Sequence, residues 1–423
     1  MAEQVSSLKT GIKYKDTPIG KIPVDWSSKS VGEVCDILDS RRIPLNKEQR
    51  DKMRGSIPYY GANGVVDYIN DSIFEDDLIL MAEDGGYFED YKNRPIAYLI
   101  HGKSWVNNHA HVLKVKEPNN TSWVFYSLAH KNIVPFIKGG TRSKLNQQEL
   151  RQILFPLPPL SEQEEIADIL KTVDQAIEKT DQIIEKTKEV KKGLMQTLFT
   201  RGIGHKKFKK TEIGEIPEEW SLLTLEEIVK KARGSIKRGP FGGAIKKEFF
   251  VPEGYKVYEQ KNVIYNDFEL GDYYIDEDKF EELKDFQISQ DDLLISCSGT
   301  IGRIVLVPRN VKKGIINQAL LRITLDEEKM MPEFFKHLFE TDSMQKKVIS
   351  HTHGSAMKNI VSMTELKKIQ FVVPSIEEQN KIVELINGVD SKVEDEQAYK
   401  LDLEQIKKGL MQVLLTGKIR VAV

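Results

Sequence analysis

The sequence predicts an α+β fold with two mixed α/β domains and two long antiparallel coiled-coil helices, arranged as an internal pseudo-twofold repeat. Two stretches about 216 residues apart are nearly the same, and the block KKGLMQ recurs unchanged at 191–196 and 407–412. The pattern I-G-x-I-P-x-x-W occurs twice, at 19–26 and 213–220. Apolar residues in both long stretches alternate at spacings of four and three, which is typical of a coiled-coil seam. The repeat decides the architecture before any motif is interpreted.

The repeat divides the chain into four consecutive segments. We expect a first body at 1–160, a first helix at 161–203, a second body at 204–374, and a second helix with its tail at 375–423. Both bodies contain short apolar runs broken by glycine, which favours a mixture of strands and short helices. Asp76–Leu80 echoes Asp291–Ile295, and Asn108–Leu113 echoes Asn317–Leu321. The two bodies should therefore share a fold, while their loops differ.

Each long helix has a predicted start and an imperfect seam. Ser161 with Glu164, and Ser375 with Glu378, match the S-x-x-E capping box. Polar residues interrupt the seam at Thr180, Thr187, Lys191, Glu396, Lys400 and Lys407. Roughly 38 residues at 1.5 Å each give a rod of about 57 Å. The second body has a radius of gyration of about 15 Å and must join the end of one helix to the start of the next, which favours antiparallel packing.

Composition is that of a soluble protein with several cores. The chain has 423 residues, 40% of them apolar, and no apolar run approaches the ~20 residues that cross a bilayer. No signal peptide opens the sequence, so we expect a cytoplasmic protein without membrane partners. Cys35 and Cys297 fall in different bodies, which argues against a structural disulfide. The net charge is -2 and both long helices are acidic, so any basic surface must arise from local clustering.

Basic and glycine-rich clusters do occur in both bodies. Glycine lets a backbone approach a phosphate, and Arg or Lys supplies charge and donors to base edges. These clusters predict DNA contacts, although solvated loops are the alternative for any one of them. The candidates in the first body are Arg41, Arg42, Lys47, Tyr59, Tyr60, Asn63, Lys138, Thr141, Arg142 and Lys144. The candidates in the second body are Arg233, Lys237, Arg238, Thr300, Arg303, His353 and Lys358.

Catalytic and metal motifs are missing from the sequence. It contains no G-x-x-x-x-G-K-[ST] loop, no H-E-x-x-H pair, and no Asn or Asp before Pro158 that would complete an amino-methyltransferase N/D-P-P motif. The pairs His109/His111 and His351/His353 could place two imidazoles on one strand face, but no cysteine lies nearby. We interpret them as strand or loop histidines, and expect no catalytic residue and no metal ligand.

The combined motifs resemble one protein family. I-G-x-I-P-x-x-W, S-G-T-I-G-R-x-x-L-V-P, P-L-P-P-L-x-E-Q-x-x-I-A-x-x-L and K-K-G-L-M-Q-x-L-x-T together resemble the specificity subunit of type I restriction–modification systems, from about Lys15 to Ile419. The resemblance implies two target-recognition domains, each reading half of an asymmetric, interrupted site in double-stranded DNA. It implies helices that act as spacers and dock two methyltransferase subunits, with restriction/translocase subunits completing the assembly.

The same resemblance implies a non-catalytic chain. S-adenosylmethionine, ATP and Mg would belong to the partner subunits, and no cofactor is expected on this chain. Glutamates on the helices are the candidate partner contacts: Glu178, Glu185, Glu394 and Glu404. The alternatives are a methyltransferase acting alone, a structural coiled-coil adaptor, and a DNA-binding protein without restriction partners.

Overall fold

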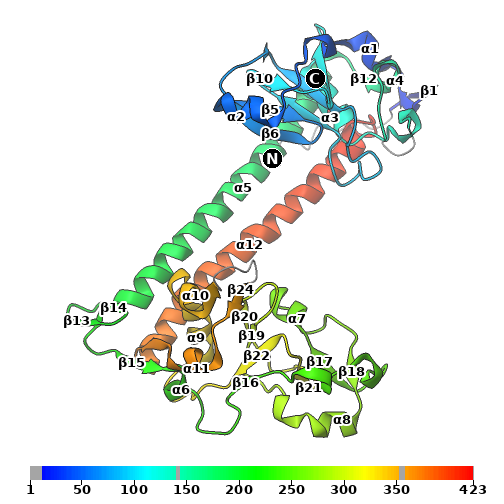
Figure 1. Ribbon diagram of the computed structural model, residues 1–423. Helices are drawn as coiled ribbons and strands as arrows, with labels where there is room; N and C mark the ends of the chain where they lie inside the picture. Colours follow the sequence, from blue (N-terminus) through cyan, green and yellow to red (C-terminus); the bar gives the residue numbers. More distant parts are fainter. Residues whose placement is uncertain (1–11, 140–142, 352–357, 423) are drawn as a thin grey trace. The chain divides into compact units, whose positions relative to one another are not determined.

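The computed structural model describes residues 12–139, 143–351 and 358–422 (Figure 1). The chain forms two compact units. The first unit comprises Met1–Gln182 and Gln397–Val423, and the second comprises Ile183–Glu396. The two long helices, α5 (Leu160–Arg201) and α12 (Ile376–Leu414), each contribute one end to each unit. Among the described residues, no helix combines the length and the apolar character needed to cross a membrane.

The first unit is built from short strands and short helices around two four-stranded sheets, with orders β6-β5-β10-β7 and β4-β11-β8-β9. All five side chains of β8 are buried, so both faces of this strand are covered by other parts of the unit. The strands are β1 (Tyr14–Thr17), β2 (Gly20–Pro23), β3 (Ser27–Ser30), β4 (Cys35–Ile37), β5 (Arg54–Gly61), β6 (Gly64–Ile69), β7 (Phe74–Glu75), β8 (Leu78–Ala82), β9 (Ala97–Ile100), β10 (Lys103–Val106), β11 (Ala110–Val115) and β12 (Leu154–Leu157). The helices are α1 (Val31–Val34), η2 (Asp39–Arg41), α2 (Lys47–Lys52), α3 (Thr121–Ala129), η3 (Val134–Phe136) and α4 (Gln147–Gln152).

The second unit repeats this plan with a four-stranded sheet of order β16-β22-β19-β20 and a three-stranded sheet of order β18-β17-β21. Its strands are β13 (Phe208–Thr211), β14 (Gly214–Pro217), β15 (Ser221–Thr224), β16 (Ile236–Arg238), β17 (Tyr255–Tyr258), β18 (Tyr274–Ile275), β19 (Leu293–Ser296), β20 (Ile304–Leu306), β21 (Gly314–Ile316), β22 (Leu320–Ile323), β23 (Ile349–His351), β24 (Lys358–Ile360) and β25 (Gln370–Val373). Its helices are α6 (Leu225–Ile228), η4 (Gly242–Ala244), η5 (Lys247–Phe249), α7 (Gln260–Ile264), α8 (Glu277–Glu282), η6 (Lys284–Phe286), α9 (Pro332–Phe339), α10 (Asp342–Val348) and α11 (Met363–Lys368).

The strand ladders fix which residues of the two units are equivalent. Leu113 pairs with Ile79 in the first unit, and Ile323 pairs with Leu293 in the second. Each unit also contains one parallel pair, β10 with β5 and β21 with β17. The strand pairing therefore confirms that the two units share a fold. It aligns the two units one residue away from the alignment that the similar sequence segments suggest. Ile79, rather than Leu78, is the counterpart of Leu293.

The long helices run antiparallel where they pack together in each unit. In the first unit, Lys407 forms an ion pair with Asp174 at 2.6 Å, and Lys400 forms one with Asp181 at 2.7 Å. Residue numbers therefore increase along α5 in the direction in which they decrease along α12. In the second unit, Lys191 pairs with Asp390 at 2.6 Å. Three of the lysines that interrupt the apolar seam are thus cross-helix ion-pair partners.

The other polar interruptions are satisfied within their own helix. The hydroxyls of Thr180 and Thr187 donate to the carbonyl oxygens of Ala176 and Ile183, one turn earlier. A side-chain bond of this kind leaves no unpaired donor in the seam. Glu396 forms an ion pair with Lys392 of the same helix.

The starts of the two long helices differ from the predicted capping boxes. Ser375 accepts a bond from the N–H of Glu378, but the Glu378 carboxylate turns away to accept from the indole Nε1 of Trp220 at 2.8 Å. The helix α5 begins at Leu160, before Ser161, and Glu162 accepts from Trp26 at 2.8 Å. The repeated tryptophan and glutamate therefore join the I-G-x-I-P-x-x-W block to the helix start.

A cation from the segment after one long helix completes the contact at the start of the other. In the first unit, the Arg420 guanidinium binds both carboxylate oxygens of Glu162 and both oxygens of Asp25. In the second, the imidazole Nε2 of His205 lies 2.9 Å from Oε1 of Glu378. We call these the Arg420 clamp and the His205 clamp. Each follows a glycine with φ near +65°, Gly417 or Gly202, the left-handed backbone that ends a helix.

Candidate nucleic-acid interface

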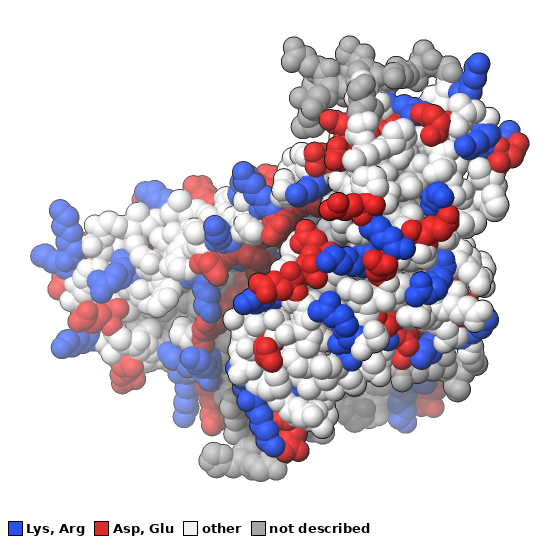
Figure 2. Space-filling model, turned by 90° about the horizontal axis from the view of Figure 1, so that it is seen from above, with Lys and Arg blue, Asp and Glu red and all other residues white. Residues whose placement is uncertain are grey.

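Charge is mixed on the face of the molecule that Figure 2 draws. Figure 2 shows Lys and Arg side chains interspersed with Asp and Glu on the face in view, as the net charge of -2 would suggest. Binding sites on such a surface must come from particular groups of side chains rather than from a broad basic patch.

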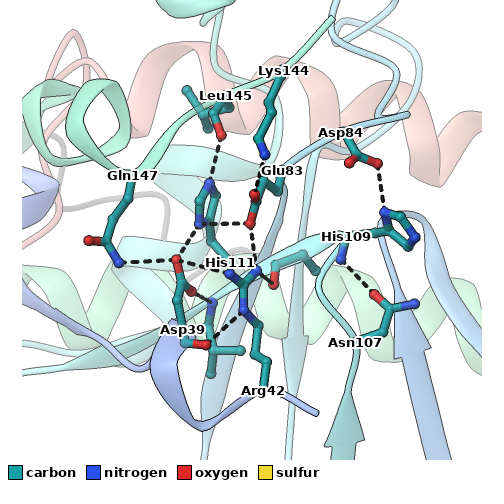
Figure 3. A network of polar contacts seen from close by, with 12 residues as sticks. Asp39, Arg42, Glu83, Asp84, Asn107, His109, His111, Lys144, Leu145 and Gln147 are labelled. Atoms are coloured by element: carbon teal, nitrogen blue, oxygen red, sulfur yellow. Dashed lines mark hydrogen bonds and ion pairs between the residues drawn. The ribbon is translucent and has the colours of Figure 1, made fainter. Parts of the chain in front are cut away.

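The first unit contains a largely buried ion network (Figure 3). His111, in β11, places its Nδ1 2.6 Å from the carboxylate of Asp39. Glu83, which follows β8, accepts from Arg42 Nη1 at 2.6 Å and forms an ion pair with Lys144 at 2.9 Å. The side chain of His111 is 1% exposed and that of Arg42 is 12% exposed. Arg42 is therefore a structural side chain here, bound inside the unit.

This network does not fit a metal ion, although Asp39, Glu83 and His111 offer ligand atoms within 4.8 Å of one another. Both ring nitrogens of His111 face acceptors, because Nε2 lies 2.8 Å from the carbonyl oxygen of Leu145. An imidazole whose two nitrogens both face acceptors has no lone pair free for a metal. The two carboxylates already have cationic partners. The cluster therefore acts as a set of internal ion pairs.

The carboxylates of the network keep their charge despite burial. Burial opposes the ionisation of Asp39, but the hydrogen bond from His111 and the nearby Arg42 hold the pKa of Asp39 below its ordinary value. Burial also opposes the ionisation of Glu83, and hydrogen bonds from Lys144 and Arg42 lower the pKa of Glu83. At neutral pH, both groups are therefore anions that hold their cationic neighbours in place.

The network holds the ends of the basic loop at 138–144. The backbone groups of Lys138 and Lys144 bond to each other at 2.9 and 2.8 Å, and Lys138 forms an ion pair with Glu149. Lys144 also forms a backbone bridge with Asp84. Two predicted contact residues of this loop, Thr141 and Arg142, lie outside the described residues.

A cleft of about 590 Å³ lies in the first unit, between the β5–β6 hairpin and the turn before β11. Its polar lining includes Asn63, Asp84, Asn107, Asn108 and His109, together with Arg50 and Tyr59. The Nδ2 of Asn63 donates to the carbonyl oxygen of Gly85 at 2.9 Å, and Nδ1 of His109 lies 2.8 Å from Oδ1 of Asp84. The structure thus brings the predicted Asn63 to a site with three polar residues that the sequence did not single out, Asn107, Asn108 and Asp84.

The remaining predicted residues of the first unit lie in different environments. Tyr59 is 1% exposed and its hydroxyl accepts from the N–H of Leu45, so it belongs to the core. Tyr60 is half-buried. Arg41 is exposed but lies over the ring of Phe74. Lys47 is exposed at the start of α2.

In the second unit, Arg238 contacts the backbone before β22 and the ring of Phe241. Its Nε donates to the backbone carbonyl of Gln318 at 3.4 Å, and its guanidinium covers the ring of Phe241. Burial raises the pKa of the Cys297 thiol to about 11, and the nearby positive charge of Arg238 opposes that rise. Arg238 therefore lies close to the turn that begins at Cys297 and contains Thr300.

That turn and the other second-unit candidates are largely exposed. Thr300 accepts at its carbonyl from Gln260 Nε2 at 3.0 Å, which fixes the turn. Arg233 and Arg303 are exposed, and their side chains have no partner in the described part of the chain. Lys237 forms an ion pair with Asp285 at 3.2 Å. His353 and the side chain of Lys358 lie outside what the structure describes.

The four helix glutamates are all exposed: Glu178, Glu185, Glu394 and Glu404. Glu185 pairs with Lys188, and Glu404 lies 3.8 Å from Lys400 of its own helix. These are ordinary surface contacts, so the carboxylates remain accessible to another protein.

Comparison with known proteins agrees with the two-unit frame. The family model described as the type I restriction modification DNA specificity domain matches residues 23–189 and again 217–405. A putative type I restriction enzyme MjaX specificity subunit of Methanocaldococcus jannaschii is 32% identical, over 96% of this chain and 97% of its own. A putative type I restriction enzyme specificity subunit of Haemophilus influenzae is 29% identical, over 87% of this chain and 88% of its own.

Solved structures show the same fold at low sequence identity. The type I restriction–modification S subunit from M. genitalium superposes with a TM-score of 0.54 at 16% identity, covering 96% of this chain and 99% of that one. A chain from a structure titled for the complex assembly and conformational transition of the type I R-M system gives a TM-score of 0.56 at 13% identity, covering 94% and 99%. The duplicated frame, the two family matches and the full-length relatives lead to one conclusion: the chain belongs to the family of type I restriction–modification DNA specificity subunits.

Proposed function

We propose that this chain selects the DNA site for a type I restriction–modification complex, with each unit reading one half of a bipartite, asymmetric site. The observation that carries the proposal is a repeated strand frame that holds different side chains in the two units. At equivalent positions the first unit has Glu83 and His111, and the second has Cys297 and Leu321. Equal frames with unequal side chains suit two readers of unequal sequences.

Exposed cations in both units are candidates for phosphate contacts, and exposed polar side chains are candidates for base contacts. Phosphate contacts give affinity that falls with salt, whereas base contacts discriminate between sequences. Arg233 and Arg303 of the second unit, and Lys47 of the first, are exposed, and no described residue pairs with their charges. They belong to the group whose replacement should weaken binding to all DNA alike.

The long helices are the proposed dock for two methyltransferase subunits. Their exposed faces carry Glu178, Glu185, Glu394 and Glu404, together with exposed apolar side chains such as Tyr399 at 52%. Acidic helices repel phosphate but suit a protein surface, particularly where apolar side chains are also exposed. S-adenosylmethionine would then be held by the methyltransferase subunits, and ATP and Mg by restriction/translocase subunits.

The test is to map methylated bases in DNA exposed to the assembled complex. We expect methylation only at a site of two unequal half-sequences separated by a fixed spacer. Combined charge reversal at the four helix glutamates should reduce co-purification of the methyltransferase, while DNA binding by this chain is retained. Methylation that is independent of this chain, or a site without two parts, would contradict the proposal.

A further inference from the structure

Each unit contains the same turn between two consecutive strands that belong to different sheets. The turn joins β10 to β11 in the first unit and β21 to β22 in the second. In the first unit, the N–H of Asn107 donates to the carbonyl oxygen of Tyr60 at 3.0 Å. The side-chain Oδ1 of Asn107 then accepts from the N–H of His109 at 2.8 Å (Figure 3). These two bonds hold both sides of the turn and direct the intervening residue, Asn108, to the surface.

The second unit forms the same turn with Asn317 in place of Asn107. The N–H of Asn317 donates to the carbonyl oxygen of Tyr258 at 3.0 Å, and its Oδ1 accepts from the N–H of Ala319 at 3.0 Å. The intervening residue is Gln318, so Asn108 and Gln318 are equivalent.

Both intervening residues present a free carboxamide. Asn108 and Gln318 are exposed, and neither side chain has a hydrogen-bond partner in the part of the chain that the structure describes. The neighbouring position is not shared, since His109 of the first unit corresponds to Ala319 of the second. Both units thus have a carboxamide side chain at this position, whereas the side chain of the next residue differs between them.

The surroundings of the two amides suit DNA. Gln318 is linked through its backbone carbonyl to the half-buried, cationic Arg238. Asn108 lines the cleft of the first unit beside Asn63 and His109. Each amide therefore stands at the edge of a region where polar side chains from separate turns converge.

We propose that Asn108 and Gln318 each read an adenine, one in each half-site. A carboxamide can donate from its NH2 group to adenine N7 while its oxygen accepts from adenine N6, a pairing that no other base offers in the major groove. The inference rests on the proposed function and adds to it the residues and the base. It predicts at least one A·T pair in each half-site.

The experiment uses the assembled methyltransferase complex, in which the wild-type methylation site is first mapped. The Asn108→Ala complex should lose discrimination at one A·T pair of one half-site by about ten- to a hundredfold, with the other half unchanged. Gln318→Ala should do the same in the opposite half. If the wild-type complex has no bipartite site, the proposed function fails; if that site exists and both variants keep full discrimination, only this inference fails.

A base analogue and a control variant separate base reading from other effects. Replacing the affected adenine by 7-deazaadenine should weaken wild-type binding about tenfold, because N7 is lost as an acceptor, and should leave binding by Asn108→Ala unchanged. The exposed Gln152→Ala variant should retain wild-type discrimination. Uniform weakening by Asn108→Ala on every sequence would indicate a phosphate contact and overturn the inference.

Discussion

The central sheets of the two units place different chemistry on equivalent strand positions. In the first unit these positions hold Asp39, Glu83 and His111, which form ion pairs beneath the basic loop. The ladders show that Cys297 and Leu321 of the second unit stand at the positions of Glu83 and His111, and both are buried and uncharged. The backbone frame thus tolerates either a charged or an apolar interior, provided that each set is complementary within itself.

The largest effect should follow from breaking the charged interior. Glu83→Leu removes one of the two carboxylates, Glu83 and Asp39, that lie against Arg42 and His111. Removing one member of a buried pair costs about 3–5 kcal/mol, so hydrogen exchange of the β8 and β11 amides should show that loss in the first unit. Cys297→Ala, at the equivalent position, removes one small apolar group and should destabilise the second unit by about 1 kcal/mol. Equal losses at the two positions would show that the ion network contributes little.

The two helix-start clamps sharpen the comparison. Arg420→Ala removes all the charged partners of Glu162, whose side chain is 1% exposed, and should cost about 2–3 kcal/mol in the first unit. His205→Ala leaves Glu378 with bonds from Trp220 Nε1 and the N–H of Ile203, so it should cost about 1 kcal/mol. Denaturant unfolding with fluorescence of the clamp tryptophans measures both. A larger effect from His205→Ala would contradict this ranking.

Lowering the pH should reduce the stability that the charged interior gives to the first unit. Because the folded state lowers the pKa of Asp39 and Glu83, their contribution to stability is present above the unfolded pKa of about 4 and is lost as the pH falls through the folded values. Glu83→Gln lacks one of these contributions. The stability gap between wild type and Glu83→Gln should therefore narrow between about pH 5 and pH 3. A gap that stays constant over this range would exclude the linkage.

The smallest effects should come from the two cross-helix pairs that the repeat makes equivalent. Lys407 with Asp174 and Lys191 with Asp390 are matching pairs in the two units, at the same 2.6 Å. Both lysines are partly exposed, so Lys407→Ala and Lys191→Ala should each cost about 0.5–1 kcal/mol. The two values should agree within error in thermal unfolding, since the surroundings repeat. A clear difference would mean that the neighbouring bodies influence the helix pair.

Much of the fold could be predicted because the repeat is visible as similarity between two segments of the sequence. The helices, their antiparallel pairing and the duplicated bodies follow from seam spacing and connectivity. The sequence could not show that Glu162 and Glu378 bind tryptophans, since that contact joins segments far apart in the chain. It also could not distinguish a lysine that interrupts a seam from a lysine that bridges two helices.

The sequence predicted the candidate contact residues less well than it predicted the fold. Residue type alone predicts contacts for Arg42 and Tyr59, yet Arg42 is paired with Glu83 and Tyr59 is in the core, because burial depends on strand register. The sequence similarity aligns Asn108 with Asn317 rather than with Gln318, so it does not show that the two exposed carboxamides are equivalent. Only the ladder hydrogen bonds correct that one-residue shift.

The clamps have a consequence for the order of the two repeats along the chain. In the second unit, His205 is followed at once by β13, so clamp and hairpin are covalently continuous. In the first unit, the hydroxyl of Tyr14 in β1 donates to the carbonyl of Gly417 at 3.3 Å, so the same neighbours meet without a peptide link. The same elements are therefore neighbours in both units, and only in the second unit does the chain run directly from one to the other. A permuted chain, joined between Arg420 and Tyr14 and opened before Phe208, should keep the contacts of both clamps, so either repeat could stand first in the chain.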